Sequence, residues 1–409
     1  MLLAVELYAT VVGTLEGDAR SFDFTPTDDA LNHVGANSNI LSVAIPLTHQ
    51  QVRHRAARRR NWFEELLPEG DQYEYMLAQA GLRRGDTPAF LARYGRDVAG
   101  ALQIWDQDDP TEPLTPDLRP LSNTEVRGLL EDPINFPLAN EPGLGKSSLG
   151  GVQPKIVLVR TKKGWAQSLG GYPTTHILKP KLPAPRSTTI FDEEYGARLA
   201  RLLGLSNYAT QIDVFDGLPT LVVERYDRGN GDRIHQEDFS QALGASRNQK
   251  YQELGGVVSL SRVSDALKVF TTNADLRTFA RRVVTCVALG DLDMHTKNLA
   301  LLHHRDGTIE LAPSYDVVPQ AHMPNDGRLA MAVNGKYRHR DITRTDLIEE
   351  FRAWRLPDPQ AIIDETLDQL ARANSDEVAL PGAYPELQSS IQLFIRNLNL
   401  IHTYASRNQ

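Results

Sequence analysis

Residues suited to chemistry gather in the segment GDLDMHTKNL, residues 290–299. Asp293 and Asn298 are five positions apart, the separation of a catalytic aspartate and a metal-binding asparagine in phosphoryl-transfer sites. An aspartate can accept the proton of an attacking hydroxyl, and an asparagine offers a neutral oxygen to Mg²⁺. Lys297 could offset charge on the transferred group. The alternative is a polar turn, but so many polar residues directly after an apolar run favour a site.

Asp316, in the segment LAPSYDVVPQ, is the candidate for a second metal ligand. Its distance along the chain from Asn298 suits the second magnesium-binding aspartate of a phosphoryl-transfer site. Because an aspartate at the end of a strand is commonly structural, this prediction depends on Asp293 and Asn298. We expect a nucleotide bound there to contact four neighbouring side chains, namely His295, Thr296, Lys297 and Tyr315.

The segment SSLGGVQPKIVL could cover the phosphates of such a nucleotide. Glycines let the backbone approach phosphate oxygens closely and leave amides to donate to them. On its own the signal is weak, because a glycine pair before a strand is more often a simple turn. The residues predicted to contact the nucleotide here are Gly150, Gly151, Val152, Gln153, Pro154 and Lys155.

Lys179 is the candidate for the lysine that binds the phosphates, because it ends the strand-like run THILK. Glu194, on the helix expected next, could pair with it as a strand lysine and a helix glutamate do in kinases. Taken singly, Lys179 would be a surface lysine and Glu194 a first-turn residue that favours the helix dipole.

The segment VVERYDR, residues 222–228, follows a strand-like run and could form a hinge. Backbone groups around Glu224, Arg225 and Tyr226 could then hydrogen-bond adenine. The alternative for Glu224 and Arg225 is an exposed ion pair, which would contribute at most ~1 kcal/mol.

The first hundred residues, which must position part of this machinery, mix strand-like runs with one helix. The runs are LLAVELYATVVGTL, ILSVAIPL and ALQIW, and the helix is expected over 61–67. An acidic, proline-rich stretch follows from Asp106 to Pro120, which cannot hold a regular helix or a central strand. It is interpreted as a linker or domain boundary.

The rest of the chain divides into strand-like and helical parts. The runs KIVLVR, THILK, IDVF and PTLVVER predict successive antiparallel strands. A helix is expected from Asp192 to Leu203, with one buried stripe through Tyr195, Leu199, Leu202 and Leu203. After Gln236 helices dominate, the last through SSIQLFIRNLNLIHTYA. A β-rich lobe followed by a helical lobe predicts an α+β, protein-kinase-like two-lobed fold with an additional N-terminal β-rich subdomain.

Composition excludes several classes of protein. The 409 residues have the apolar and charged fractions of an ordinary globular chain, and the net charge of -8 argues against bulk binding of nucleic acid. Two basic segments, RHRAARRR and KYRHR, are interpreted as solvated faces, with a contact strip for DNA as the alternative. The only cysteine, Cys286, is predicted to be buried and structural. No membrane span or signal peptide is recognised, so a cytoplasmic location is expected.

The order of these segments resembles the HipA toxins of bacterial HipBA toxin–antitoxin modules. The matching segments are SLGGVQPK, THILKP, DEEYGARLARLLGL, VERYDR, HQEDFSQALG, GDLDMHTKN and SYDVVP. The N-terminal stretch is similar to the first subdomain of that family through VGTLEG, LSVAIPL, LLPEG and GRDVAGAL. The resemblance spans most of the chain and stops being specific after about Pro319.

The resemblance implies a serine/threonine protein kinase that uses ATP and Mg²⁺, with aminoacyl-tRNA synthetases as the protein targets. Asp293 would be the catalytic base, and Asn298 and Asp316 would bind magnesium. Ser148, with Ser147 beside it as the alternative, would be the serine whose autophosphorylation expels the loop and silences the kinase. The loop departs from the usual QEK of the family at Pro154, which removes an amide donor and puts its contacts in doubt.

The resemblance also implies a partner, a small HipB-like DNA-binding antitoxin that holds the toxin inactive and represses the operon. In that complex operator DNA would be bound mainly by the antitoxin. The candidate contacts of this chain with DNA are Lys336, Arg338 and Arg340.

Two other functions are compatible with the same residues. The first is a small-molecule kinase of the aminoglycoside or lipid type, which would leave the N-terminal subdomain unexplained. The second is an inactive kinase fold that serves as a corepressor, which the intact candidate residues argue against. We expect an N-terminal subdomain over 1–105, a linker over 106–140, a kinase N-lobe over 141–230 and a helical C-lobe over 231–409.

Overall fold

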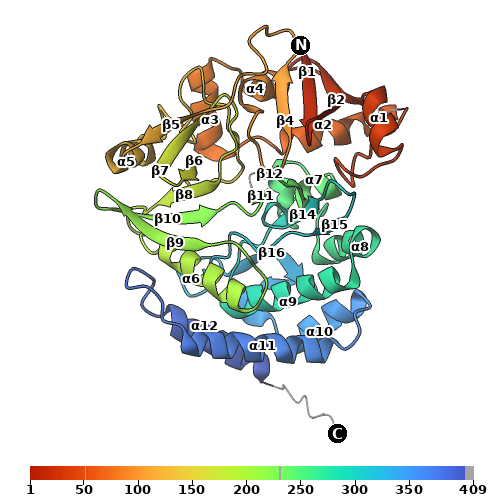
Figure 1. Cartoon of the computed structure of the whole chain (residues 1–409). Helices are drawn as coiled ribbons and strands as arrows, with labels where there is room; N and C mark the ends of the chain where they lie inside the picture. Colours follow the sequence, from red (N-terminus) through yellow and green to blue (C-terminus); the bar gives the residue numbers. More distant parts are fainter. Residues whose placement is uncertain (51, 230–231, 401–409) are drawn as a thin grey trace. The chain divides into compact units, whose positions relative to one another are not determined.

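The chain divides into two compact units, each assembled from segments that lie far apart in sequence (Figure 1). The computed structural model describes residues 1–50, 52–229 and 232–400. The first unit takes residues 1–186, 208–248 and 300–312, and the second takes 187–207, 249–299 and the chain from 313 onward. The helix that carries Glu194 therefore belongs to the second unit, although strands of the first unit flank it in sequence.

The first unit begins with a sheet and its helices, whose bounds are β1 (Leu2–Leu7), β2 (Thr10–Gly17), β3 (Phe22–Pro26), β4 (Gln103–Asp106), α1 (Asp28–Val34), α2 (Ala56–Glu64), α3 (Gly70–Ala80) and α4 (Thr87–Tyr94). The strands are antiparallel in the order β3-β2-β1-β4. Tyr8 and Ala9 take the left-handed conformation between β1 and β2, which closes a tight hairpin. Trp62 and Phe63 of α2 are buried in the core of this sheet.

The second sheet of this unit has six strands, with bounds β5 (Asp117–Leu121), β6 (Ile156–Thr161), β7 (Gly164–Leu169), β8 (His176–Pro180), β9 (Thr210–Phe215) and β10 (Leu218–Glu224). The order is β5-β7-β6-β8-β10-β9, and every pair is antiparallel. β5 contains Pro120 and lies at an edge, where a missing amide donor is tolerated. Helix α5 (Asn123–Glu131) packs against this sheet through Val126 and Leu130.

The remaining elements of the first unit are short: β11 (Arg228–Gly229), β12 (Asp232–Arg233), β13 (His235–Asp238), α7 (Phe239–Leu243), β14 (Ala300–His303) and β15 (Ile309–Leu311). Strands β13, β14 and β15 form an antiparallel sheet, so residues 235–238 meet a segment that follows them by more than sixty positions. A capping box at Asp238 and Gln241 begins α7.

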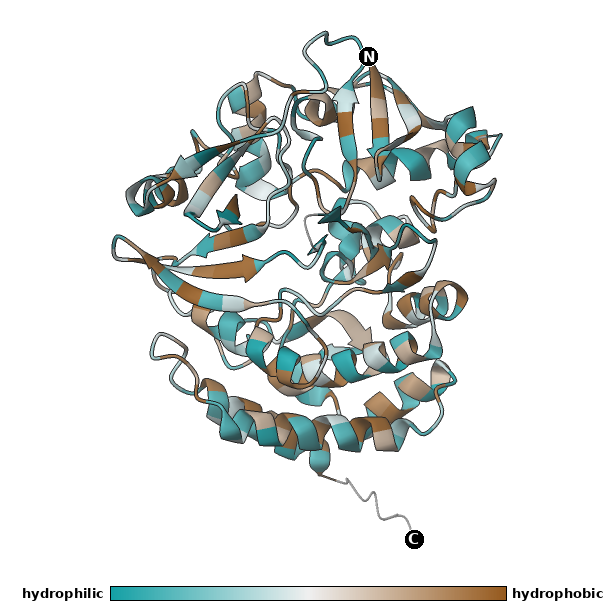
Figure 2. Cartoon of the chain, in the orientation of Figure 1, coloured by the Kyte–Doolittle hydropathy of each residue, from teal (hydrophilic) through white to brown (hydrophobic). Residues whose placement is uncertain are grey.

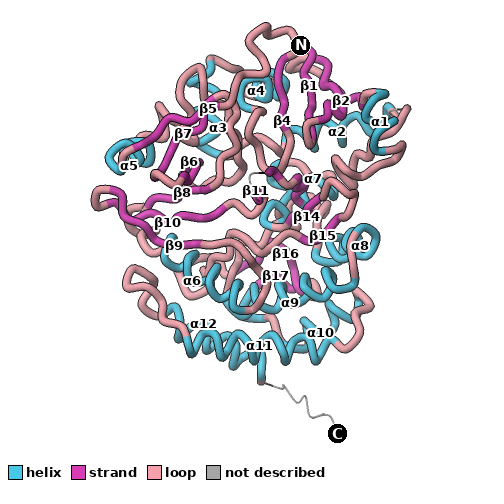
Figure 3. Tube along the Cα trace, viewed as in Figure 1, coloured by secondary structure: helices cyan, strands magenta, loops and turns pink. Residues whose placement is uncertain are grey.

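The second unit is mainly helical, as the cyan tubes of Figure 3 show. Its bounds are α6 (Thr189–Leu202), α8 (Leu260–Phe270), α9 (Asn273–Leu289), α10 (Arg344–Ala353), α11 (Pro359–Asp376), α12 (Leu387–Asn399), β16 (Arg328–Val333) and β17 (Lys336–Arg338). Helix α9 is the centre, since α8, α11 and α12 all pack against it. Hydrophobic and hydrophilic residues alternate along α11 and α12 in Figure 2, as expected for helices with one buried face.

Most elements expected from the sequence are present. The stretch 106–140, expected as a linker, contains β5 and α5 of the six-stranded sheet, and three further expectations are corrected. The run ILSVAIPL is not a strand, because its backbone is irregular apart from one bridge at Leu47. Helix α6 begins at Thr189, so of its three acidic residues only Asp192 lies in the first turn. Leu202 was placed in the buried stripe of α6, but it is exposed.

Two expectations reach residues outside the described ranges. These are the end of the last expected helix, over 401–405, and the lobe boundary at 230–231. Among the described helices, none combines the length and the apolar character that crossing a membrane requires.

Candidate active site

In the second unit, the segment 290–299 directly follows helix α9. The helix ends at Gly290, which takes the left-handed conformation with φ 71°. A Cβ at this position would lie 2.7 Å from Ala321, so glycine is required by space as well as by backbone. Cys286, one turn earlier, is buried and donates to the carbonyl of Asp291, which confirms a structural thiol. Burial raises the pKa of that thiol well above its ordinary value.

Asp293 is the most accessible carboxylate of this segment, with its side chain 44% exposed. The hydroxyl of Tyr251 donates to its Oδ1 at 3.2 Å, and Nε2 of His295 lies 4.0 Å from its Oδ2. The side-chain amide of Asn298 donates to the backbone carbonyl of Asp293 at 2.9 Å. That bond orients the amide so that its oxygen, the atom that can bind a cation, is the group left to face away from Asp293.

A buried arginine and a tyrosine fix the backbone on the far side of this loop. Arg282 of α9 donates to the carbonyl of Asn298 at 2.6 Å, and its guanidinium lies 5.5 Å from the ring centroid of Tyr315. Tyr315 in turn donates to the carbonyl of Lys297 at 2.8 Å. Since Asp316 follows Tyr315 directly, these contacts tie the two candidate metal-binding segments together.

Asp316 lies within the electrostatic reach of the same loop. It takes a left-handed conformation, φ 55°, which aspartate tolerates better than most residues. The carboxyl of Asp291 is buried in negatively charged surroundings. Burial raises its pKa well above the ordinary value, and the charges of Asp293 and Asp316 raise it further. The charges of Asp293 and Asp316 thus both act on Asp291, directly after α9.

The donor set at this place fits Mg²⁺. Among the described residues no group of three or more His, Cys, Asp or Glu side chains could hold a metal ion. Magnesium does not need such a group, because it is commonly bound by one or two protein oxygens together with substrate phosphates. Asn298 and Asp316 would supply an amide and a carboxylate oxygen, and the acidic surroundings favour a cation.

Glu194 lies on α6, which is held by the segment between α11 and α12. Its carboxylate accepts from Arg198 at 2.8 Å, and Arg198 also binds Glu377 at 2.8 Å. Tyr195 bonds Asn374 at 3.1 Å, and burial raises the pKa of its phenol to about 12. The C-terminal part of the chain, which sequence assigned no role beyond helical packing, thus positions α6.

In the first unit, the glycine segment lies beside the lysine that follows it. Gly151 has φ 100°, in the region that favours glycine, and a Cβ there would overlap the ammonium group of Lys155. Lys155 is buried, directly before β6, while Val152 is 61% exposed at the tip of the segment. This confirms that Lys155 introduces a strand.

The two candidate phosphorylation sites are both buried. Ser147 donates to the carboxylate of Asp97 at 3.0 Å, and Ser148 donates to the carbonyl of Leu66 at 3.1 Å. The amide of Ser148 also bonds the carbonyl of Asp97 at 2.9 Å. Both hydroxyls are buried and bonded in this conformation, so modification of either serine would require the segment to leave its place.

Lys179 lies on β8, opposite Leu221 of β10, and its side chain is mostly buried. It therefore is not the surface lysine of the alternative interpretation. Lys179 and Glu194 belong to different units, and their pairing stays a prediction.

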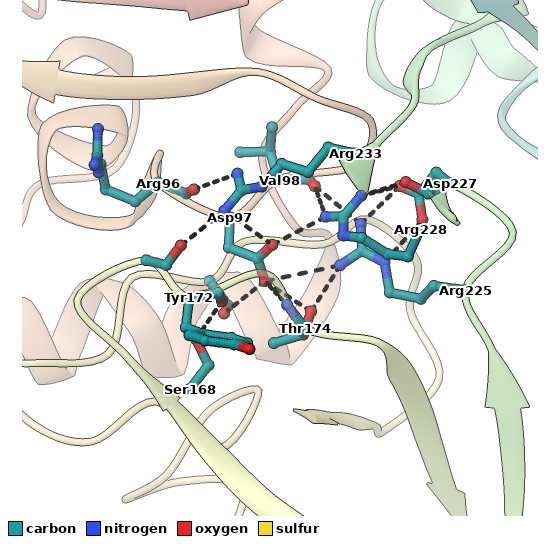
Figure 4. A network of polar contacts seen from close by, with 12 residues as sticks. Arg96, Asp97, Val98, Ser168, Tyr172, Thr174, Arg225, Asp227, Arg228 and Arg233 are labelled. Atoms are coloured by element: carbon teal, nitrogen blue, oxygen red, sulfur yellow. Dashed lines mark hydrogen bonds and ion pairs between the residues drawn. The ribbon is translucent and has the colours of Figure 1, made fainter. Parts of the chain in front are cut away.

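The hinge candidates end β10 and lead into a buried polar network (Figure 4). Arg225 is 3% exposed and binds Asp227 through two bonds, at 3.0 and 2.7 Å. The alternative of an exposed Glu224–Arg225 ion pair is wrong, because Arg225 instead pairs with Asp227 inside the unit. Burial raises the pKa of Asp227, but Arg225 and Arg228 lower it further, so it lies below its ordinary value.

The same network reaches the serine segment through Asp97. Its carboxylate accepts from Arg228 at 2.9 Å, from Thr174 at 2.7 Å and from Ser147. The amides of Glu224 and Arg225 already donate to backbone carbonyls.

The candidate DNA contacts lie on β17 and directly after it in the second unit. Lys336, Arg338 and Arg340 are all exposed. Lys336 binds Asp346 at 2.8 Å, while the side chain of Arg340 is 76% exposed and lies 3.8 Å from Asp341. The contact with DNA stays a prediction.

The structure thus brings Asp293, Asn298 and Asp316 together in the second unit. It keeps Lys179, the glycine segment and the hinge in the first. Sequence reasoning missed three residues. Asp291 lies in the loop and accepts from the amide of Asp293, while Arg282 contacts the loop from α9 and Tyr251 from the segment before α8. Only Asp291 had a local signal, as a further acid in the polar segment.

Comparison with known proteins identifies a class that matches this fold and site. The sequence model described as HipA-like C-terminal domain matches residues 147–376, and the one described as HipA N-terminal domain matches residues 3–105. A protein of Sinorhizobium fredii named "Putative kinase Y4mE" is 35% identical over 73% of this chain and 72% of that protein.

Two further similarities concern Shewanella oneidensis. Its serine/threonine-protein kinase toxin HipA is 29% identical over 83% of this chain and 80% of that protein. The solved complex of HipA, HipB and operator DNA from the same organism contains a chain that matches with a TM-score of 0.79 and 26% identity, over 97% of this chain and 95% of that one.

The fold and the kinase class predicted from the sequence are confirmed: this is an α+β, protein-kinase-like serine/threonine kinase. The chain belongs to the HipA family of toxin kinases. Membership in a kinase class argues against one alternative, an inactive corepressor. The other alternative, a small-molecule kinase, left the N-terminal subdomain unexplained, whereas that subdomain matches the N-terminal domain of the family.

Proposed function

We propose that this kinase transfers phosphate from ATP to serine or threonine in a protein target, with Mg²⁺ held by Asn298 and Asp316. The supporting observation is that Asn298 bonds the backbone of Asp293, while Arg282 and Tyr315 join this loop to the segment of Asp316. Bound ATP supplies the phosphoryl group, and Mg²⁺ neutralises charge on its phosphates. Asp293 accepts the proton of the acceptor hydroxyl.

The first unit would bind the nucleotide. Lys179 holds the phosphates, and residues 150–155 cover them through backbone amides and Lys155. Adenine lies against the backbone of Glu224, Arg225 and Tyr226. Glu194 would serve as the partner of Lys179.

The target and partners are inferred from the similarity to the family. The related Shewanella protein is a toxin, solved with HipB and operator DNA. We infer an aminoacyl-tRNA synthetase as the substrate of this chain, so that its phosphorylation halts translation. A HipB-like antitoxin would silence the kinase and carry it to operator DNA, with Lys336, Arg338 and Arg340 as additional contacts.

Autophosphorylation of Ser148, or of Ser147, would be a second means of silencing. Each serine bonds within the first unit, so a phosphate group of about -1.5 to -2 charge cannot be accommodated there. The modified segment would stay out of its place over the nucleotide and leave the kinase inactive.

One experiment tests the reaction. Purified chain is incubated with labelled ATP, Mg²⁺ and a cell extract, and phosphorylated sites are mapped. We expect label on serine or threonine of a protein, no transfer after Mg²⁺ is chelated, and only a slow residual transfer by a folded Asp293→Asn variant. Label on a small molecule would instead identify a metabolite kinase, and full activity in Asp293→Asn would falsify the mechanism.

A further inference from the structure

Tyr251 contacts the candidate catalytic base directly. Its hydroxyl donates to Oδ1 of Asp293 at 3.2 Å, from the segment that precedes α8. The two residues are 42 positions apart in sequence, so the contact depends on the fold of the second unit rather than on local geometry.

One residue of β16 sets the spacing between the two segments. The amide of Ala330 donates to the carbonyl of Leu292 at 2.9 Å, and the carbonyl of Ala330 accepts from the amide of Gln252 at 3.0 Å. Leu292 precedes Asp293 and Gln252 follows Tyr251. The side chain of Gln252 adds a second bond to this strand, from the amide of Ala332 at 2.9 Å. The backbone therefore holds Tyr251 and Asp293 at a fixed separation.

The ring of Tyr251 is also held on its faces and edge. It meets the ring of His295 edge-on, with centroids 5.3 Å apart and planes at 84°. The ammonium group of Lys250 lies 5.4 Å from its centroid. The carbonyl of Lys250 accepts from the hydroxyl of Thr296 at 3.3 Å, which joins the Tyr251 segment to the catalytic loop once more. Little freedom is left for the phenol to turn away from Asp293.

We propose that Tyr251 is a positioning residue for Asp293, holding the carboxylate in the rotation that receives the acceptor hydroxyl. This inference rests on the proposed function, in which Asp293 is the base. A carboxylate has two oxygens with about four lone pairs between them, so a bond from Tyr251 to Oδ1 is compatible with a second donor. A partly exposed carboxylate turns readily about its last bond, and a fixed phenol removes that freedom before the substrate arrives.

The expected effect is on the rate of transfer rather than on nucleotide binding. Tyr251 acts on the group that meets the acceptor hydroxyl, while ATP is assigned to Lys179, the glycine segment and the magnesium ligands. Removal of the phenol oxygen should accordingly lower kcat and leave the KM for ATP unchanged.

The test compares Tyr251→Phe with Tyr337→Phe in the full-length chain, using labelled ATP and the acceptor protein found in the extract experiment. Tyr337 is the matched control. Like Tyr251 it is a tyrosine whose ring lies near a cationic side chain, here 5.2 Å from the guanidinium of Arg328, but it lies on β17 and not beside Asp293 in sequence or in any described contact. We expect Tyr251→Phe to lower kcat by about threefold to tenfold with an unchanged KM for ATP and an unchanged Tm. Tyr337→Phe should match the unsubstituted chain.

A second comparison asks whether the phenol acts through Asp293. In an Asp293→Asn background, Tyr251→Phe should change the slow residual rate by less than about twofold, because the group that it positions is gone. An equal loss in both backgrounds would overturn the inference. Full activity of Tyr251→Phe, with activity lost in Asp293→Asn, would overturn it too and leave the proposed function standing.

Discussion

The guanidinium of Arg282 donates to the backbone carbonyl of Asn298 at 2.6 Å from within helix α9. Because Arg282 is buried and its guanidinium also lies against Tyr315, the residue before Asp316, one side chain supports both candidate magnesium ligands. We predict that Arg282→Leu raises the Mg²⁺ concentration needed for half-maximal activity and lowers kcat by about tenfold or more. A titration of activity with Mg²⁺ measures both effects.

The neighbouring Arg281 provides the control for Arg282. It bonds the carbonyl of Leu203 at 2.6 Å and the side chain of Gln369 at 2.9 Å, away from the catalytic loop. Arg281→Leu should lose stability, by about 1–2 kcal/mol, without a change in Mg²⁺ dependence. An equal shift in Mg²⁺ dependence for both variants would show that general loosening of α9, rather than the bond to Asn298, is responsible.

The second prediction concerns the glycine segment. Gly151→Ala would place a methyl group against the ammonium of Lys155 at a positive φ, so both the loop and the lysine must move. We expect the KM for ATP to rise about threefold to tenfold, measured at saturating acceptor. Gly143→Ala carries the same backbone strain but no atom lies within 4 Å of its added Cβ, so its KM should not change.

The third prediction separates the two serines. After incubation with ATP, intact-mass measurement should show one added phosphate on the unsubstituted chain and on Ser147→Ala, but none on Ser148→Ala. The reverse pattern would move the modified site by one residue. Because both hydroxyls are buried and bonded, we also expect modification to be slow compared with phosphorylation of the target.

The fourth prediction is a pH dependence of stability from His235. Nε2 bonds the carbonyl of Leu41 at 2.8 Å, while Nδ1 is buried without a hydrogen-bond partner in the described part of the chain. Burial lowers the pKa of His235 from 6.5 to about 3, and the nearby His303 lowers it as well, while Glu237 and Asp227 oppose the shift.

The sign follows from proton binding. Since the folded pKa lies below the unfolded one, the unfolded chain binds more protons between these values. The free energy of unfolding should therefore fall by about 1.4 kcal/mol for each pH unit below 6.5. Urea unfolding between about pH 6 and pH 5 measures this slope. His235→Gln should flatten it, whereas replacement of the exposed His33 should not.

Sequence patterns predicted those elements in which a regular pattern of apolar residues extends over many positions. The predominance of helices after Gln236, including α12, and strands β6, β8, β9 and β10 were expected. Strands β13 to β17 were missed because the chain after Gln236 was interpreted as mainly helical, and β13 pairs with β14, a segment more than sixty positions away. The run ILSVAIPL misled because its apolar side chains are buried without a regular backbone.

The candidate site divides in the same way. Asp293 and Asn298 were found because their spacing is local, and the side chain of one bonds the backbone of the other. Tyr251 and Arg282 could not be found, since nothing in their own segments distinguishes them from a surface tyrosine or a helix arginine. Their roles arise when β16 and α9 bring them to the loop.

The complete burial of Ser148 should also limit how fast this serine is modified. If this serine is the one modified, its hydroxyl can react only during the intervals in which the segment is open. The modified fraction would then increase with the accumulated open time of each molecule, at a rate set by the bonds to Leu66 and Asp97. The opening rate of the segment would then set how long each kinase molecule stays active. Substitutions that weaken those bonds would shorten this active lifetime without changing the catalytic groups.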